Sequence, residues 1–110
     1  MEYENFCFND KNEIEKMLKS SNELDIPKIL VGSINGVDDW EWLQNLCLKY
    51  VNHPDFWVST TAISGLSDIA RIHGFLEKEK VLKKISSLKN PKLKEVIVNT
   101  IDDISIFLNN

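Results

Sequence analysis

The chain has few residues that break secondary structure or form covalent cross-links. Among its 110 residues are four glycines, three prolines and two cysteines, too few for a flexible linker or a disulfide framework. Cys7 and Cys47 are expected to be free thiols. No apolar run approaches the roughly 18 residues that a membrane span requires, and the first residues lack the pattern of a signal peptide. These features predict one cytoplasmic domain, residues 1–110, with no membrane partner.

A surplus of basic charge is also missing. Thirteen lysines and arginines against seventeen aspartates and glutamates give a net charge of −4. A nucleic-acid binder needs excess positive charge on one face, so this balance disfavours nucleic acid and mildly favours a basic protein as partner. No glycine-rich phosphate loop, paired zinc motif or nucleophile elbow is present. We therefore expect no metal, no cofactor and no enzymatic activity.

What the chain does contain is apolar residues at helical spacing over most of its length. Sustained alternation of apolar and polar residues, which is typical of strands, does not occur. The predicted fold class is all-α, with six helices as three antiparallel pairs. The expected helices span residues 11–20, 26–36, 39–52, 56–73, 81–88 and 92–108. Asp38 with Glu41 has the spacing of a capping box for the third helix, and Gly74 is a typical end for the fourth.

The last two pairs share one pattern. A displacement of 37 or 38 residues superimposes the prolines of two corners, Pro54 on Pro91, and then three apolar or small positions of the helices that follow. A period of this length is typical of helical repeats, whose units cannot bury their apolar faces alone. In the last helix the residues expected to face inward are Val96, Ile97, Thr100, Ile104, Phe107 and Leu108.

The run NHPDFWVSTTAISGLSDIARIHG resembles the loop and second helix of a HEAT repeat. In such repeats an Asp caps the helix, a Val follows closely, and an Ala and a Leu come four and eight residues after the Val. Ser59 stands where a basic residue is usual, a departure from the Asp-Arg ladder of long HEAT arrays. The resemblance covers about residues 39–108, and it implies a short HEAT-like solenoid.

A looser resemblance concerns function. WEW, HPD, SDIARIHG and the closing TIDDISIFL are similar to segments of small bacterial HEAT-like immunity proteins of contact-dependent or polymorphic toxin systems. This resemblance implies a protein-binding module that occludes a cognate toxin with a basic surface, such as a nuclease, and that is a monomer before the complex forms. The alternatives are a cytosolic adaptor or regulatory scaffold and, further off, a HEAT-like enzyme acting on nucleic acid.

Candidate partner-binding residues lie along one edge of the fourth helix. Helical spacing aligns Trp57, Thr61, Ser64, Asp68 and Arg71, and an exposed Trp beside charged residues is typical of an interface hot spot. The alternative for Trp57 is packing on a neighbouring helix pair, with the polar residues forming a solvated face.

Further candidates lie on the third and last helices. Asp102 and Asp103 can contact a basic toxin surface, although pairing of one of them with Arg71 is the more economical expectation. Trp40 and Trp42 cannot both face the core, and the acidic, aromatic start of this helix, with Trp42 as the candidate, can receive an Arg or Lys of the partner through cation-π attraction. The alternative is that these residues form a local staple of the turn after Gly36. His53 and His73 are explained by a corner and a helix end.

Overall fold

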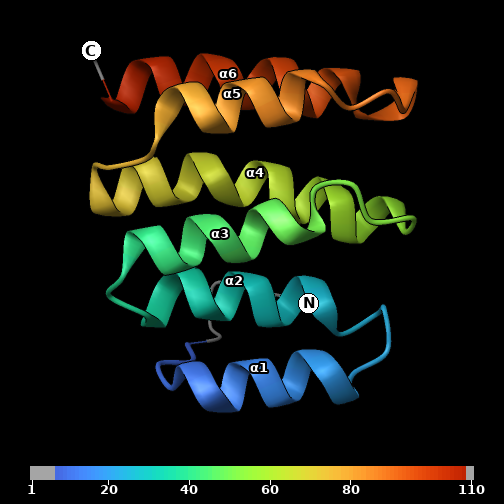
Figure 1. Ribbon diagram of the computed structural model, residues 1–110, viewed down its shortest axis with the longest axis vertical. Coiled ribbons are helices and arrows are strands. Elements are labelled where there is room, and N and C mark those ends of the chain that lie inside the picture. The colour runs from blue at the N-terminus through green and yellow to red at the C-terminus, as the bar shows by residue number, and fades with distance from the viewer. Residues whose placement is uncertain (1–6, 109–110) are drawn as a thin grey trace.

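The computed structural model describes residues 7–108, and the predicted domain of residues 1–110 extends beyond this range at both ends. Within it no strand forms, so the predicted all-α class is confirmed. Figure 1 shows the helices following one another along the longest axis, with the chain crossing the view and returning in successive helices. The elements are α1 (Lys11–Ser20), α2 (Ile26–Gly36), α3 (Trp40–Tyr50), α4 (Phe56–His73), α5 (Lys78–Ser86), the short 3₁₀ turn η2 (Pro91–Leu93) and α6 (Lys94–Leu108).

The longest helix, α4, organises the core. It packs most extensively against α6 and then against α3 and α2, whereas α1 lies on α2 and α5 lies on α6. Its 18 residues include a row of fully buried side chains. The buried row of α4 consists of Val58, Ala62, Ile63, Leu66 and Ile69.

None of the helices in residues 7–108 has the length and apolar character needed to cross a bilayer.

The repeated seam is largely present in α6. Thr100 and Ile104 are buried at positions equivalent to Ala62 and Leu66 of α4. The inward placement predicted for Phe107 is wrong, because its side chain is 41% exposed. At 100° per residue Phe107 lies only about 20° from the buried Thr100 and about 40° from Asp103, so the spacing is correct, but Phe107 falls in the last turn of α6, where Ser105 and Ile106 are exposed too. It therefore extends the edge of α6 on which Asp103 lies.

The start of α3 differs from the prediction by one residue. The cap is Asp39, whose carboxylate accepts a hydrogen bond of 3.1 Å from the backbone N–H of Trp42, so the capping box of Asp38 with Glu41 does not form. The shift follows from Val37. This residue is buried directly after α2, and the chain therefore begins α3 one residue later than the sequence pattern predicts. The ammonium of Lys11 lies 2.6 Å from Asp39 Oδ2, and this hydrogen bond, with that of Trp42, lowers the pKa of Asp39.

Most of the other helix ends agree with the sequence patterns, but α5 spans Lys78–Ser86 where residues 81–88 were expected. Asp10 and Asp55 cap α1 and α4 through their carboxylates. Gly74 ends α4 in the left-handed region, with φ of 76°, a conformation that costs other residues free energy. The third helix ends at Tyr50 instead of Asn52. These ends fix the orientation of α4, which carries most of the candidate site.

Candidate functional site

Trp57 is held in the first turn of α4. The carboxylate of Asp55 accepts hydrogen bonds from the backbone N–H groups of Trp57 (2.9 Å) and Val58 (3.1 Å), which fixes this turn. Val58 is fully buried, whereas the adjacent Trp57 is 68% exposed. The ring of Phe56 meets the indole edge-on, with centroids 5.4 Å apart. The helix therefore presents an indole to solvent, and the alternative in which Trp57 packs on a neighbouring pair is wrong.

The α4 edge, by which we mean Trp57, Thr61, Ser64, Asp68 and Arg71, is one continuous strip of surface. Every member is at least partly accessible to solvent, and Trp57 and Arg71 are exposed. The buried row of the same helix packs against α2, α3 and α6. The hydroxyl of Ser64 donates to the carbonyl oxygen of Thr61 at 3.3 Å. The structure thus brings the five predicted residues together on the side of α4 that the other helices leave open.

The carboxylate of Asp68 is the electrostatic centre of this edge. Partial burial raises the pKa of Asp68 above its ordinary value; the guanidinium of Arg71 counteracts this shift and the carboxylate of Asp103 adds to it. Arg71 Nη2 lies 3.4 Å from Asp68 Oδ1. The carboxylate of Asp103 on α6 is therefore close enough to act on Asp68 of α4, and Arg71 partly balances the charge of Asp68.

The predicted pairing of Arg71 with Asp102 or Asp103 is wrong. Within the described part of the chain Arg71 forms its ion pair with Asp68. Asp68 precedes Arg71 by three residues on the same helix, so the two side chains meet without reaching across to α6. Asp102 is exposed and Asp103 is half-buried, and both carboxylates remain available to a positively charged group from outside.

Trp42 does not join the α4 edge. It lies on α3, is half-buried, and has the ammonium of Lys11 over its ring at 5.7 Å from the centroid. The cation-π position that we assigned to a partner is thus filled from within the chain. Its neighbour Trp40 stacks against Phe75, with ring centroids 6.0 Å apart. The two tryptophans consequently fasten α3 to α1 and to the connection that follows α4.

The two histidines and Cys47 have structural explanations. His53 Nδ1 accepts a hydrogen bond of 3.0 Å from the backbone N–H of Asp55, and in the same corner the buried hydroxyl of Ser59 donates to the carbonyl of Val51. His73 Nδ1 lies 3.9 Å from a carboxylate oxygen of Asp38. Burial raises the pKa of Cys47 to about 12, with a further contribution from the charge of Asp68, so this thiol is unreactive near neutral pH.

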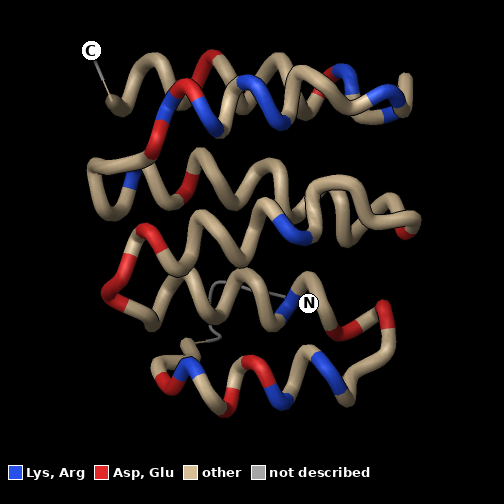
Figure 2. Tube along the Cα trace, in the orientation of Figure 1, with Lys and Arg blue, Asp and Glu red and all other residues tan. Residues whose placement is uncertain are grey.

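One charged region is hidden by the overall composition. Residues 78–94 hold seven of the thirteen basic residues and a single acidic one, Glu79. The net charge of −4 therefore averages a strongly basic segment with an acidic remainder, and reasoning from the average missed this segment. Figure 2 shows the basic positions gathered on α5, on η2 and at the start of α6. A count of charge segment by segment is the sequence signal that identifies such a region.

Comparisons with known proteins add no assignment. No protein-family model, no curated protein and no solved structure matches the chain. Among residues 7–108, no group of three or more His, Cys, Asp or Glu side chains is placed to hold a metal ion. The candidate site rests on the α4 edge, on Asp102, Asp103 and Phe107 of α6, and on the basic segment.

Proposed function

We propose that the protein is a short HEAT-like solenoid that binds another protein. Two observations support this architecture. The even-numbered helices pack on one another in the order α2, α4, α6, and each odd-numbered helix packs on an even-numbered one. In addition, buried residues of α4 and α6 recur at the displacement of 37 or 38 residues seen in the sequence. Stacked helix pairs of this kind leave one layer of helices accessible to a partner.

The exposure of Trp57 carries the proposal of protein binding. An indole that is 68% exposed on a capped helix contributes little to the core, whereas Trp is enriched among residues that dominate binding energy at interfaces. Asp68 lies further along the same edge, and the carboxylate of Asp103 on α6 is close enough to influence it. Large aromatic area and incompletely balanced carboxylates together suit a partner surface that presents apolar groups beside Lys or Arg.

The biological role that we propose is immunity against a cognate bacterial toxin, as the resemblance of the sequence implies. The α4 edge, with Asp102 and Asp103, would cover a basic toxin surface and thereby exclude the toxin's substrate. Complementary charge would accelerate the association and set specificity, while the indole would make a large single contribution to the affinity. The net charge of −4 suits this partner better than it suits a nucleic acid.

Coexpression of this chain with the product of the gene that lies next to its own gene tests this role. The expected result is that the chain copurifies with that product and restores the growth of cells that the product inhibits. The double variant Trp57→Ala/Asp68→Lys should lose both effects while its circular dichroism stays unchanged, because neither side chain belongs to the hydrophobic core. A wild-type chain that neither copurifies nor restores growth contradicts the proposed role.

A further inference from the structure

A groove runs between α3 and α5 on the side formed by the odd-numbered helices. These helices pack on α4 and α6, and contacts between α3 and α5 themselves are few. The resulting hollow has a volume of about 550 Å³ and is open to solvent, within the range of about 300 to 1,000 Å³ that is usual for ligand sites. The lysine groove, as we call it, is lined by Asn45, Leu48, Lys49, Lys80, Lys83, Lys84 and Ser87.

Apolar surface and positive charge dominate the lining of the lysine groove. Four of its seven residues are lysines, and none is acidic. Leu48 is the apolar residue of the lining and is half-buried, and most of the groove surface is apolar, because lysine stems lie along apolar surface while their ammonium groups reach water. The groove thus combines an apolar floor with a rim of ammonium groups.

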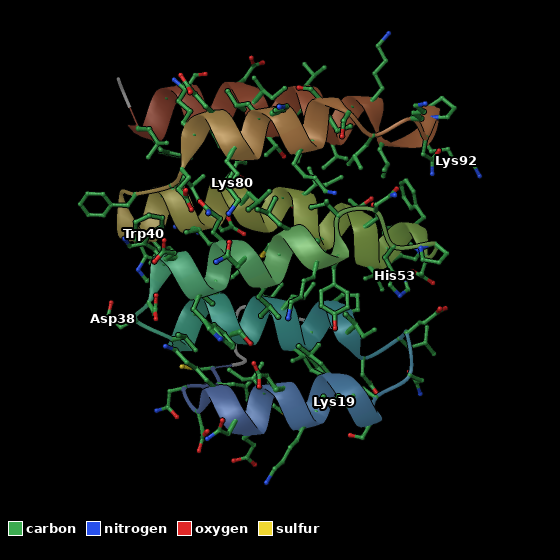
Figure 3. The ribbon with its side chains drawn as sticks, in the orientation of Figure 1. Lys19, Asp38, Trp40, His53, Lys80 and Lys92 are labelled. Atoms are coloured by element: carbon green, nitrogen blue, oxygen red, sulfur yellow. The ribbon has the colours of Figure 1, made fainter. Side chains whose placement is uncertain are left out.

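Three of these ammonium groups have no counterion among residues 7–108. Lys80 crosses from α5 toward α3, where its Nζ lies 3.4 Å from Asn45 Oδ1, and it also lies 3.7 Å from a carboxylate oxygen of Glu77 (Figure 3). No ion pair with another residue between 7 and 108 is formed by Lys49, Lys83 or Lys84. Like charges gathered in one place repel one another, so an anionic partner would relieve a repulsion that the folded chain leaves uncompensated.

We propose that the lysine groove binds an acidic polypeptide segment that inserts one or two apolar side chains. The apolar floor would bury these side chains, and the lysines would pair with carboxylates on either side of them. Nucleic acid fits less well, because the lining contains no aromatic residue on which a base could stack and the remainder of the chain is acidic. This surface is separate from the α4 edge, and the proposal does not depend on the proposed function.

Titration of the isotopically labelled protein with a short synthetic peptide, rich in glutamate and containing two leucines, tests the proposal by NMR. The largest changes of amide chemical shift are expected at residues of the groove, including Leu48 and Ser87. Replacing the glutamates with glutamines, or the leucines with serines, should each weaken binding about tenfold, because both charge and apolar contact contribute. Equal affinity of the glutamine peptide overturns the proposal.

Variants of the protein complete the test. Lys83→Glu/Lys84→Glu should weaken peptide binding by about tenfold or more, whereas Lys16→Glu/Lys89→Glu, which makes the same change of net charge outside the groove, should leave affinity within about twofold. If the glutamate pair destabilises α5, Lys83→Gln/Lys84→Gln removes the charge at smaller cost and should weaken binding about threefold or more. Unchanged affinity in the folded groove variant overturns the proposal, as does tighter binding of a single-stranded oligonucleotide at the same amides.

Discussion

A buried glutamine fastens the connection between α4 and α5 to the core. The side chain of Gln44, on α3, is fully buried. Its Nε2 donates to Glu77 Oε1 at 2.8 Å, and its Oε1 accepts from the backbone N–H of Glu77 at 2.7 Å. Glu77 immediately precedes α5. We therefore predict that Gln44→Leu, which preserves the approximate size of the side chain and removes both hydrogen bonds, will destabilise the fold.

The expected magnitude follows from the two bonds. A hydrogen bond to a charged group contributes about 1.5 to 3 kcal/mol, and a neutral one contributes about 0.5 to 1.5 kcal/mol. The carboxylate of Glu77 is partly exposed, with 42% of its side chain accessible, so water replaces part of what is lost there. We expect a loss of about 2 kcal/mol in the free energy of unfolding and a fall in the melting temperature of roughly 10 °C. Urea denaturation followed by circular dichroism measures the former directly.

A matched variant separates hydrogen bonding from charge. Glu77→Gln keeps an oxygen that accepts from Gln44 and keeps the backbone N–H, so it should cost less than about 1 kcal/mol. A free energy of unfolding of Gln44→Leu within about 0.5 kcal/mol of the wild-type value refutes this prediction, because the loss of both hydrogen bonds would then cost the fold almost nothing.

Two further predictions concern titration and thiol reactivity. In an NMR titration the carboxyl of Asp68 should show a pKa above that of an ordinary Asp, so the contribution of this group to stability declines as pH rises through its titration. Arg71→Gln should raise this pKa, and Asp103→Asn should lower it. A pKa at or below that of an ordinary Asp contradicts the account. Ellman's reagent should modify the exposed Cys7 in the native protein and Cys47 only after unfolding; rapid modification of both native thiols contradicts it.

Local chemistry made most helix ends predictable. Asp10, Asp55 and Gly74 act at the ends that the sequence indicated, because caps depend on a few neighbouring residues. The start of α3 was missed because either of two consecutive aspartates can cap a helix, and only Asp38 has the Glu three residues later that a capping box needs. The choice of Asp39 follows from tertiary features, namely the burial of Val37 and the ion pair of Asp39 with Lys11, which a local pattern does not contain.

The errors at the candidate site have a common physical origin. Helical periodicity placed the α4 edge correctly on one face, but it does not state which neighbouring helix lies opposite each residue. Arg71 therefore paired with Asp68 on its own helix instead of with α6, and Phe107 lies at the surface instead of in the seam. The lysine groove depends on two helices that are far apart in sequence, so the sequence contains only its charge, in residues 78–94, and not its shape.

Calorimetric titration of the chain with the product of the adjacent gene tests the central claim most directly, because the two surfaces serve as controls for each other. If the α4 edge is the binding surface, Trp57→Ala should weaken the complex by about thirtyfold or more, while Lys83→Glu/Lys84→Glu should leave the affinity within about threefold. Unchanged affinity for Trp57→Ala, with loss of binding in the lysine variant, would contradict the assignment of the α4 edge.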